Sequence, residues 1–191
     1  MVVKHPLQLV VIVGSTRQGR FAPTVAKWFA DHAGRRDDVA IDVVDLATVH
    51  LPEILGTPGT AEVAAMAQRL GGADAFVVVT PEYNHSFPAP LKNAIDWHSK
   101  EWKAKPVGFV SYGGASGGLR AVEQLRQVFA ELHAVTVRDT VSFHGAWALF
   151  DPTGQPIEAA RFERSADRML DELAWWGESL RKARMENPYS F

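Results

Sequence analysis

Residues 75–97 read AFVVVTPEYNHSFPAPLKNAIDW, and two kinds of secondary structure follow one another within this stretch. Its first five residues are apolar and mostly β-branched, which is typical of a strand buried on both faces of a parallel sheet. From Leu91 onward the apolar residues fall on a helical period, and Pro90 stands in the first turn, where helices tolerate proline. The stretch therefore predicts a central strand, a loop and a helix.

The loop between this strand and this helix, PEYNHSFPAP, contains three prolines, which fix φ and stiffen the backbone. Open α/β sheets bind ligands beyond the carboxyl ends of their strands, and the loop lies at such an end. A stiff loop there is suited to present backbone N–H and C=O groups to a flat polar ring. The alternative is an ordinary connection between a strand and a helix.

Strands and helices alternate along the rest of the chain. Because strands separated by helices form parallel sheets with right-handed crossovers, we expect an α/β fold with helices on both faces of the sheet. A length of 191 residues indicates a single domain over residues 1–191. Strands are predicted at 7–13, 39–45, 75–79, 107–111 and 135–137, with 141–150 partly extended, and helices at 22–33, 61–70, 91–98, 119–133 and 157–184.

The composition excludes several classes of function. Lys and Arg number 20 against 22 Asp and Glu, a net charge of -2 without a basic block, which argues against nucleic-acid binding. No cysteine is present, so disulfides, thiolate catalysis and cysteine-bound metals are excluded, and the seven histidines show no ligand spacing. No apolar stretch approaches the ~20 residues that span a bilayer, and no signal peptide is recognisable. We expect a cytoplasmic protein without a metal site or membrane association.

The first loop, GSTRQGR at 14–20, has the features of a phosphate site. It delivers a strand to a helix N-terminus, where free N–H groups and the helix dipole favour an anion. Ser15 and Thr16 add hydroxyl groups, and Arg17 and Arg20 add guanidinium forks. The loop matches neither G-x-G-x-x-G nor a P-loop, which favours a phosphate monoester over a pyrophosphate. The alternative is that Ser15 caps the helix and both arginines are solvated.

We predict the strand order 2-1-3-4-5, in which the strands at 7–13 and 75–79 are neighbours on either side of the switch point. The loops after these strands then share one crevice, which suits a ligand with a phosphate at one end and an aromatic ring at the other. The glycine-rich loop SYGGASGG follows the strand at 107–111 and lies beside them, where glycines permit a close backbone approach to a ring. A plain helix entry is the alternative for that loop.

The three loops resemble those of the NADPH-dependent FMN reductase family, the flavodoxin-like quinone, chromate and azo reductases. The resemblance rests on GSTRxGR, TPEYNxSxPxxLKNAIDW and SYGGxxGG. It implies a flavodoxin-like three-layer sandwich around a five-stranded parallel sheet, FMN as cofactor, NADPH or NADH as co-substrate, and a homodimer or homotetramer. Many family members carry a small hydroxyl or amide residue where this chain has Arg20.

The resemblance also implies the residues of the cofactor site. The residues that would hold the FMN phosphate are Ser15, Arg17 and Arg20. Those that would line the isoalloxazine ring and the ribityl chain are Pro81, Glu82, Tyr83 and Asn84. Those that would close the other side of the ring are Ser111, Tyr112, Gly113 and Gly114.

The implied reaction passes hydride from NAD(P)H through FMN to a small acceptor: a quinone, a flavin, an azo compound or a metal oxyanion. Because the flavin carries the chemistry, no catalytic side chain is expected. One alternative is a serine hydrolase, since GASGG fits G-x-S-x-G around Ser116, and Asp139 and His144 follow in the order of a triad. The other is a non-catalytic FMN-binding electron carrier, although such carriers tend to be more acidic than a net charge of -2.

Overall fold

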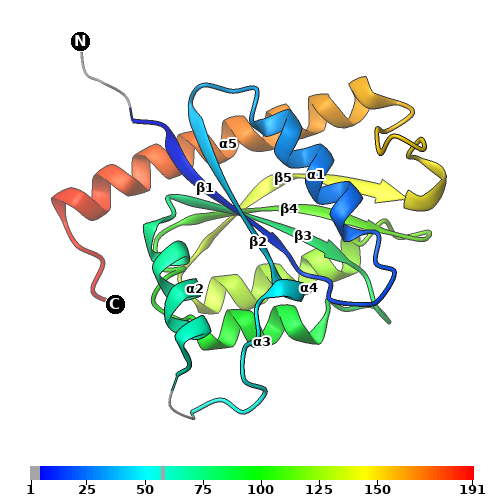
Figure 1. Ribbon diagram of the computed structural model, residues 1–191. Helices are drawn as coiled ribbons and strands as arrows, with labels where there is room; N and C mark the ends of the chain where they lie inside the picture. Colours follow the sequence, from blue (N-terminus) through cyan, green and yellow to red (C-terminus); the bar gives the residue numbers. More distant parts are fainter. Residues whose placement is uncertain (1–4, 57–58) are drawn as a thin grey trace.

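Five parallel strands form the middle layer of the structure, a computed structural model that describes residues 5–56 and 59–191 (Figure 1). The strands are β1 (Leu7–Val13), β2 (Val39–Asp45), β3 (Ala75–Pro81), β4 (Pro106–Gly113) and β5 (Val135–His144). Their order is β2-β1-β3-β4-β5, and every neighbouring pair is parallel. The predicted order 2-1-3-4-5 is therefore confirmed, and the switch point lies between β1 and β3.

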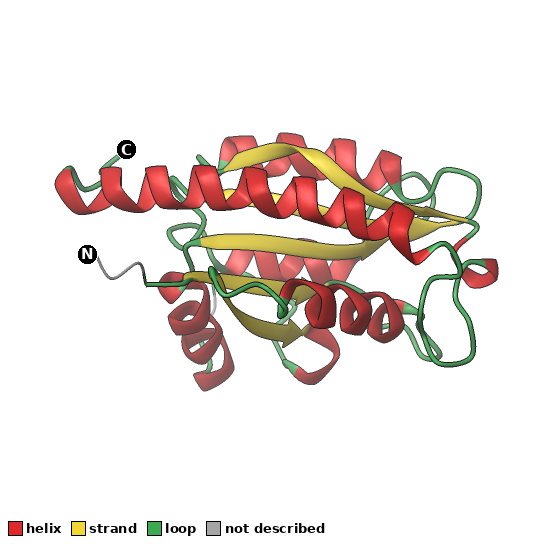
Figure 2. Cartoon of the chain, turned by 90° about the horizontal axis from the view of Figure 1, so that it is seen from above, coloured by secondary structure: helices red, strands yellow, loops and turns green. Residues whose placement is uncertain are grey.

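Helices cover both faces of the sheet, which lies between them in Figure 2. They are α1 (Ala22–Ala33), α2 (Ala61–Gly72), α3 (Ala89–Trp97), α4 (Leu119–Glu131) and α5 (Ala159–Glu186), with short 3-10 turns η1 (Leu46–Thr48) and η2 (Ala146–Ala148). One hydrophobic cluster joins the sheet to α1 and α5, and a second joins the opposite face to α2, α3 and α4. All seven residues of β3 are buried, as its apolar run predicts for a strand covered on both faces.

Helix boundaries differ from prediction by a few residues. Helix α2 continues through the glycine pair at 71–72 instead of ending at 70, and the N–H of Ala73 closes it on the Leu70 carbonyl. Helix α4 ends at Glu131, because His133 adopts a left-handed φ of 59°. Among the described residues, no helix is long and apolar enough to cross a membrane.

Three strands extend beyond their predicted ends. Strand β3 continues to Pro81, paired with β4. Strand β5 runs unbroken from Val135 to His144, whereas the prediction begins a strand at 135–137 and continues it partly extended over 141–150. Beyond residue 144 that prediction is wrong, because residues 146–148 form η2. Strand β5 pairs with β4 through an irregularity between Val107 and Phe109, which interrupts the regular alternation. Pairing with β5 also carries β4 through Tyr112 to Gly113, so these residues belong to the strand rather than to the loop.

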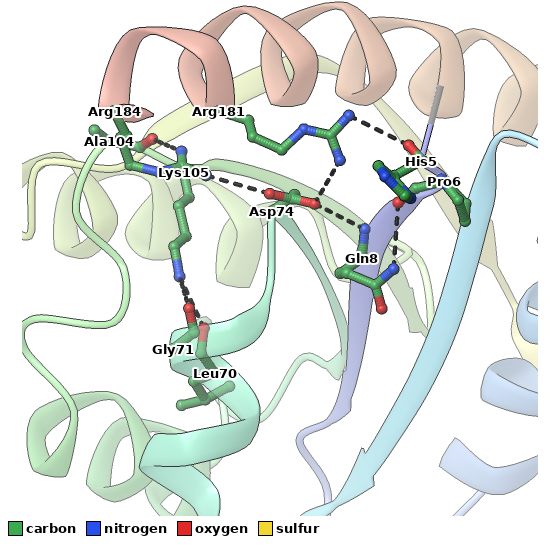
Figure 3. A network of polar contacts seen from close by, with 10 residues as sticks. All are labelled: His5, Pro6, Gln8, Leu70, Gly71, Asp74, Ala104, Lys105, Arg181 and Arg184. Atoms are coloured by element: carbon green, nitrogen blue, oxygen red, sulfur yellow. Dashed lines mark hydrogen bonds and ion pairs between the residues drawn. The ribbon is translucent and has the colours of Figure 1, made fainter. Parts of the chain in front are cut away.

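A partly buried ion cluster closes the amino edge of the sheet, where β1 and β3 begin (Figure 3). Asp74 is 8% exposed, and its carboxylate accepts a hydrogen bond from the Gln8 backbone N–H at 3.1 Å. The same carboxylate pairs with Arg181 at 3.1 Å and with Arg184 at 3.4 Å, both from α5. Asp74 therefore ties the end of the longest helix to two central strands.

Lys105 lies beside this cluster and is 6% exposed. Its ammonium group donates to the Leu70 carbonyl at 2.9 Å and to the Gly71 carbonyl at 3.0 Å, the last turn of α2 (Figure 3). Loss of hydration on burial, together with the positive charge of Arg184, lowers the pKa of Lys105 to about 8. Lys105 thus caps the C-terminus of α2 and lies close to the positive charge of Arg184 in α5.

Candidate active site

A cleft of about 360 Å³ opens at the carboxyl edge of the sheet. The loops that follow β1, β3, β4 and β5 meet there, so the first and third loops share one crevice as the strand order requires. The lining residues are Arg17, Gly19, Arg20, Phe21, Pro81, Glu82, Tyr83, Tyr112, Gly113, Gly114 and Trp147. A second cleft of about 460 Å³ lies beside Thr16, between the segment after β2 and the start of α3.

The loop after β1 begins with a glycine that the packing requires. A Cβ atom at Gly14 would lie 3.0 Å from Leu91 and 3.3 Å from the carbonyl oxygen of Val79, which accepts the Gly14 N–H. The next residue, Ser15, is fully buried, and its hydroxyl bonds the Tyr83 hydroxyl at 2.8 Å. The loops after β1 and β3 are therefore joined side chain to side chain.

The remainder of this loop retains unused donors. The backbone N–H groups of residues 16–19 donate no hydrogen bond within the described part of the chain. Arg17 is exposed and lines the cleft, and the first turn of α1 contains no acidic residue. Such a combination is suited to an anion.

Arg20, which the resemblance implies as a phosphate contact, is paired with a carboxylate. Both of its terminal nitrogens bind Asp45, at 2.5 and 2.6 Å, and one of them also donates to the Ser15 carbonyl at 2.8 Å. The hydrogen bonds that Arg20 donates to Asp45 raise the pKa of Arg20, and burial only partly opposes them. The fork expected to hold a phosphate is therefore engaged by a carboxylate of β2.

The PEYN loop turns back on itself in a two-residue hairpin. Tyr83 and Ser86 exchange backbone hydrogen bonds of 2.8 and 3.0 Å. Between them Asn84 and His85 have φ values of 51° and 69°, and two left-handed residues in succession form a type I′ turn. Asn84 is exposed at the tip, away from the lining, and asparagine is among the residues that tolerate this conformation.

Glu82 anchors the same loop to α4. Its carboxylate accepts the Arg120 backbone N–H at 3.1 Å and the Arg120 guanidinium at 2.9 Å. Burial raises the pKa of Glu82, but the hydrogen bonds from Arg120 and Ser116 outweigh burial, and the pKa lies below its ordinary value. The carboxylate is a structural acceptor at neutral pH.

The loop after β4 depends on two left-handed glycines. Gly117 and Gly118 have φ values of +59° and +87°, and a Cβ atom at Gly118 would lie 2.7 Å from the Ser111 Cβ. Ser111 is fully buried and donates to the Gly117 carbonyl at 2.8 Å. Ser111 therefore shapes this loop from behind, whereas Tyr112, Gly113 and Gly114 reach the cleft.

The segment after β5 supplies a wall of the cleft that the sequence does not indicate. The Gly145 N–H donates to the Gly114 carbonyl at 2.8 Å, which joins η2 to the loop after β4. Trp147 in η2 is 64% exposed and lines the cleft. A three-residue 3-10 turn has no periodicity to detect, so the only signal is a tryptophan outside every predicted helix.

The residues of the hydrolase alternative do not form a triad. His144 bonds the Ser142 hydroxyl at 3.1 Å and the Ala115 carbonyl at 2.9 Å. Ser116 instead hydrogen-bonds Glu82. Among the described residues, Ser116 is therefore not paired with His144 as a nucleophile is paired with its base.

Comparison with known proteins agrees with this geometry. The model of the NADPH-dependent FMN reductase family matches residues 7–148. An NAD(P)H-dependent FMN reductase of Schizosaccharomyces pombe is 39% identical over 131 residues, 63% of this chain and 64% of that protein. A quinone reductase of Escherichia coli (strain K12) is 33% identical over 194 residues, 96% of this chain and 100% of that protein. Among solved structures, the flavoenzyme NAD(P)H:(acceptor) oxidoreductase FerB of Paracoccus denitrificans has a TM-score of 0.72 at 22% identity, over 91% and 98% of the two chains.

Proposed function

Because the chain belongs to the NADPH-dependent FMN reductase family, we propose that it reduces quinones or similar small acceptors with NADPH or NADH, using FMN held in the 360 Å³ cleft. The observation that carries this proposal is the meeting of an anion-binding loop with two loops suited to a flat ring. Bound FMN supplies the redox chemistry, accepting hydride from NAD(P)H and passing electrons to the acceptor. Residues 1–191 would act as one FMN-binding domain.

We assign the phosphate of FMN to the loop after β1. The free N–H groups at 16–19 and the guanidinium of Arg17 would donate to its oxygens, and the buried Ser15 hydroxyl would lie beside them. Charge-assisted hydrogen bonds contribute roughly 1.5–3 kcal/mol each, so three of them account for much of the ~8 kcal/mol of a micromolar complex.

We assign the ring to the space between the loops after β3 and β4. Pro81, Tyr83, Tyr112, Gly113 and Gly114 line this space, and the exposed Gly114 has no side chain to keep a ring from its backbone. The three remaining predicted site residues would act through the backbone: Glu82 and Ser111 hold the two loops in shape, and Asn84 forms the turn.

Trp147 would lie at the side of the cleft where NAD(P)H and the acceptor bind in turn. Its exposed indole lies at the rim of the cleft, and aromatic stacking contributes about 0.5–1.5 kcal/mol beyond area burial. A quinone is planar and apolar enough to stack on it. We therefore assign acceptor binding, rather than FMN binding, to this residue.

We further propose that the chain assembles as a homodimer or homotetramer. The second cleft is lined by both apolar and polar residues; the apolar ones come from the segment after β2 and from α3, and Leu55 nearby is 49% exposed. Exposed apolar surface of this kind commonly marks an interface, and a two-fold axis would pair it with itself. Light scattering tests this assembly, and Leu55→Asp would shift the mass toward the monomer. We place the protein in the cytoplasm, where NAD(P)H is available.

The absorption spectrum of the purified protein tests the function. We expect a yellow protein whose flavin absorbance is lost when NADPH is added without oxygen and returns when a quinone is added. Steady-state NADPH oxidation distinguishes an enzyme from an electron carrier. Protein that neither binds FMN nor oxidises NADPH would contradict the proposal, as would esterase activity that is lost in Ser116→Ala.

A further inference from the structure

Arg20 and Asp45 form a two-point ion pair behind the loop after β1. The distances are 2.5 and 2.6 Å, and the two side chains are only 17% and 27% exposed. Asp45 is itself fixed, because its carboxylate also accepts the Ala47 N–H at 3.1 Å and so caps η1. The pair therefore connects the end of β2 firmly to the turn that precedes α1.

One further bond extends this pair into the anion-binding loop. Of the two Arg20 nitrogens that bind Asp45, Nη1 also donates to the Ser15 carbonyl at 2.8 Å. The peptide that follows is planar and trans, so a carbonyl held toward Arg20 holds the Thr16 N–H in the opposite direction. Thr16 is the first of the four residues whose N–H groups are unused within the described chain.

The charges of the pair cancel. Asp45 keeps its carboxylate ionised, because the hydrogen bonds from Arg20 and Ala47 outweigh burial and lower its pKa. Arg20 therefore adds little net positive charge to the loop, and the exposed Arg17 is the guanidinium left for an anion.

We propose that Arg20 is a positioning residue and not a phosphate ligand, and that Asp45, despite its negative charge, promotes FMN binding by holding Arg20 on the Ser15 carbonyl. This inference rests on the proposed function. The opposite view, in which Arg20 binds the phosphate directly, makes Asp45 a competitor for the same fork and a repulsive neighbour of a dianion.

The two views predict opposite signs for Asp45→Asn. The substitution adds net positive charge near the phosphate and leaves an amide oxygen to accept the Ala47 N–H. If Arg20 is a ligand, FMN should bind more tightly. If Arg20 positions the loop, FMN should bind about tenfold more weakly, since one charge-assisted contact is lost from the support of the loop.

The experiment titrates the full-length apoprotein with FMN and with riboflavin, which lacks the phosphate, and follows flavin fluorescence. Asp42→Asn is the matched control: Asp42 lies on the same strand and forms a two-point pair with Arg69 at 2.5 and 2.8 Å, with 49% and 39% exposure. We expect Asp45→Asn to weaken FMN about tenfold and riboflavin less than twofold, and Asp42→Asn to change neither.

Arg20→Lys provides a second test that keeps the charge and removes the fork. We expect a similar loss of FMN affinity, and no further loss when it is combined with Asp45→Asn, because both substitutions break the same support. Unchanged or tighter FMN binding by Asp45→Asn, with wild-type protein that binds FMN, would overturn this inference alone. Wild-type protein that does not bind FMN would instead overturn the proposed function.

Discussion

The two edges of the sheet use the same chemistry for different purposes. At the amino edge Asp74 is 8% exposed and pairs with Arg181 and Arg184, so that each charge serves to fasten one part of the chain to another. At the carboxyl edge Arg20 and Asp45 also pair, but Arg17 and the N–H groups of residues 16–19 beside them have no such partner among residues 5–56 and 59–191. The comparison teaches that the edge that binds a ligand is recognised by the charged side chains and N–H groups that remain without a partner inside the protein.

The largest expected effect is a loss of stability when the ion cluster at the amino edge is disrupted. Asp74→Asn leaves two half-buried guanidinium groups without their carboxylate, and loss of one member of a buried pair costs about 3 kcal/mol in the free energy of unfolding. Urea denaturation measures this loss, and the FMN dissociation constant should change less than twofold. The exposed pair in Asp42→Asn should cost less than about 1 kcal/mol. Equal losses in both variants would contradict the contrast between the edges.

The second effect is a pH dependence of stability that also belongs to the amino edge. The pKa of Lys105 is about 8 in the folded chain and its ordinary value is 10.5, so between these values unfolding takes up a proton and stability rises with pH. We expect a gain of up to about 2 kcal/mol between pH 8 and 9.5, from 1.36 kcal/mol per pH unit. Above pH 10, burial of Tyr112, which raises its pKa, acts in the opposite direction.

Lys105→Met is the control for this pH profile. It removes the titrating group, so the free energy of unfolding measured in urea should be nearly flat between pH 8 and 9.5. A rise of the same size in Lys105→Met and wild-type protein would assign the dependence to another group.

The third expected effect tests the phosphate site at the carboxyl edge. Arg17→Gln removes the exposed guanidinium that is left for the phosphate, and we expect the FMN dissociation constant to rise about 30-fold, equivalent to about 2 kcal/mol. Riboflavin should bind as before. Arg35→Gln, just past the opposite end of α1 and 65% exposed, should leave both constants unchanged. A loss below threefold in Arg17→Gln would contradict the assignment of the phosphate to this loop.

The smallest effect concerns the rim of the cleft. Trp147→Ala should raise the KM for a quinone about fivefold, equivalent to about 1 kcal/mol of stacking, with FMN affinity unchanged. Trp147→Phe should recover most of the loss, because a ring remains. Trp175→Ala, which removes a 63% exposed tryptophan from α5, should have no effect in the same steady-state assay.

The strands and the loops at their ends could be predicted because the apolar run of β3 and the glycine-rich loops are local signals. The order 2-1-3-4-5 follows from the common arrangement of alternating strands and helices. The pairing of Arg20 with Asp45 could not be predicted, since it depends on the register that sets Asp45 beside Val13 at the end of β1. The family resemblance predicts Asn84 in the cofactor site, whereas its exposed place in the turn depends on φ, which side-chain chemistry alone does not reveal. Trp147 lies in a turn too short to show any period.

Arg181 and Arg184 lie within the last six residues of a helix that ends at Glu186, so the point at which the chain is shortened matters. A chain shortened to end at residue 186 would keep both guanidinium groups, and an affinity tag or fusion partner could be joined directly after that residue. A stop codon after residue 180 would remove both arginines and leave Asp74 without them. The cleft, at the other edge of the sheet, would keep every one of its lining residues.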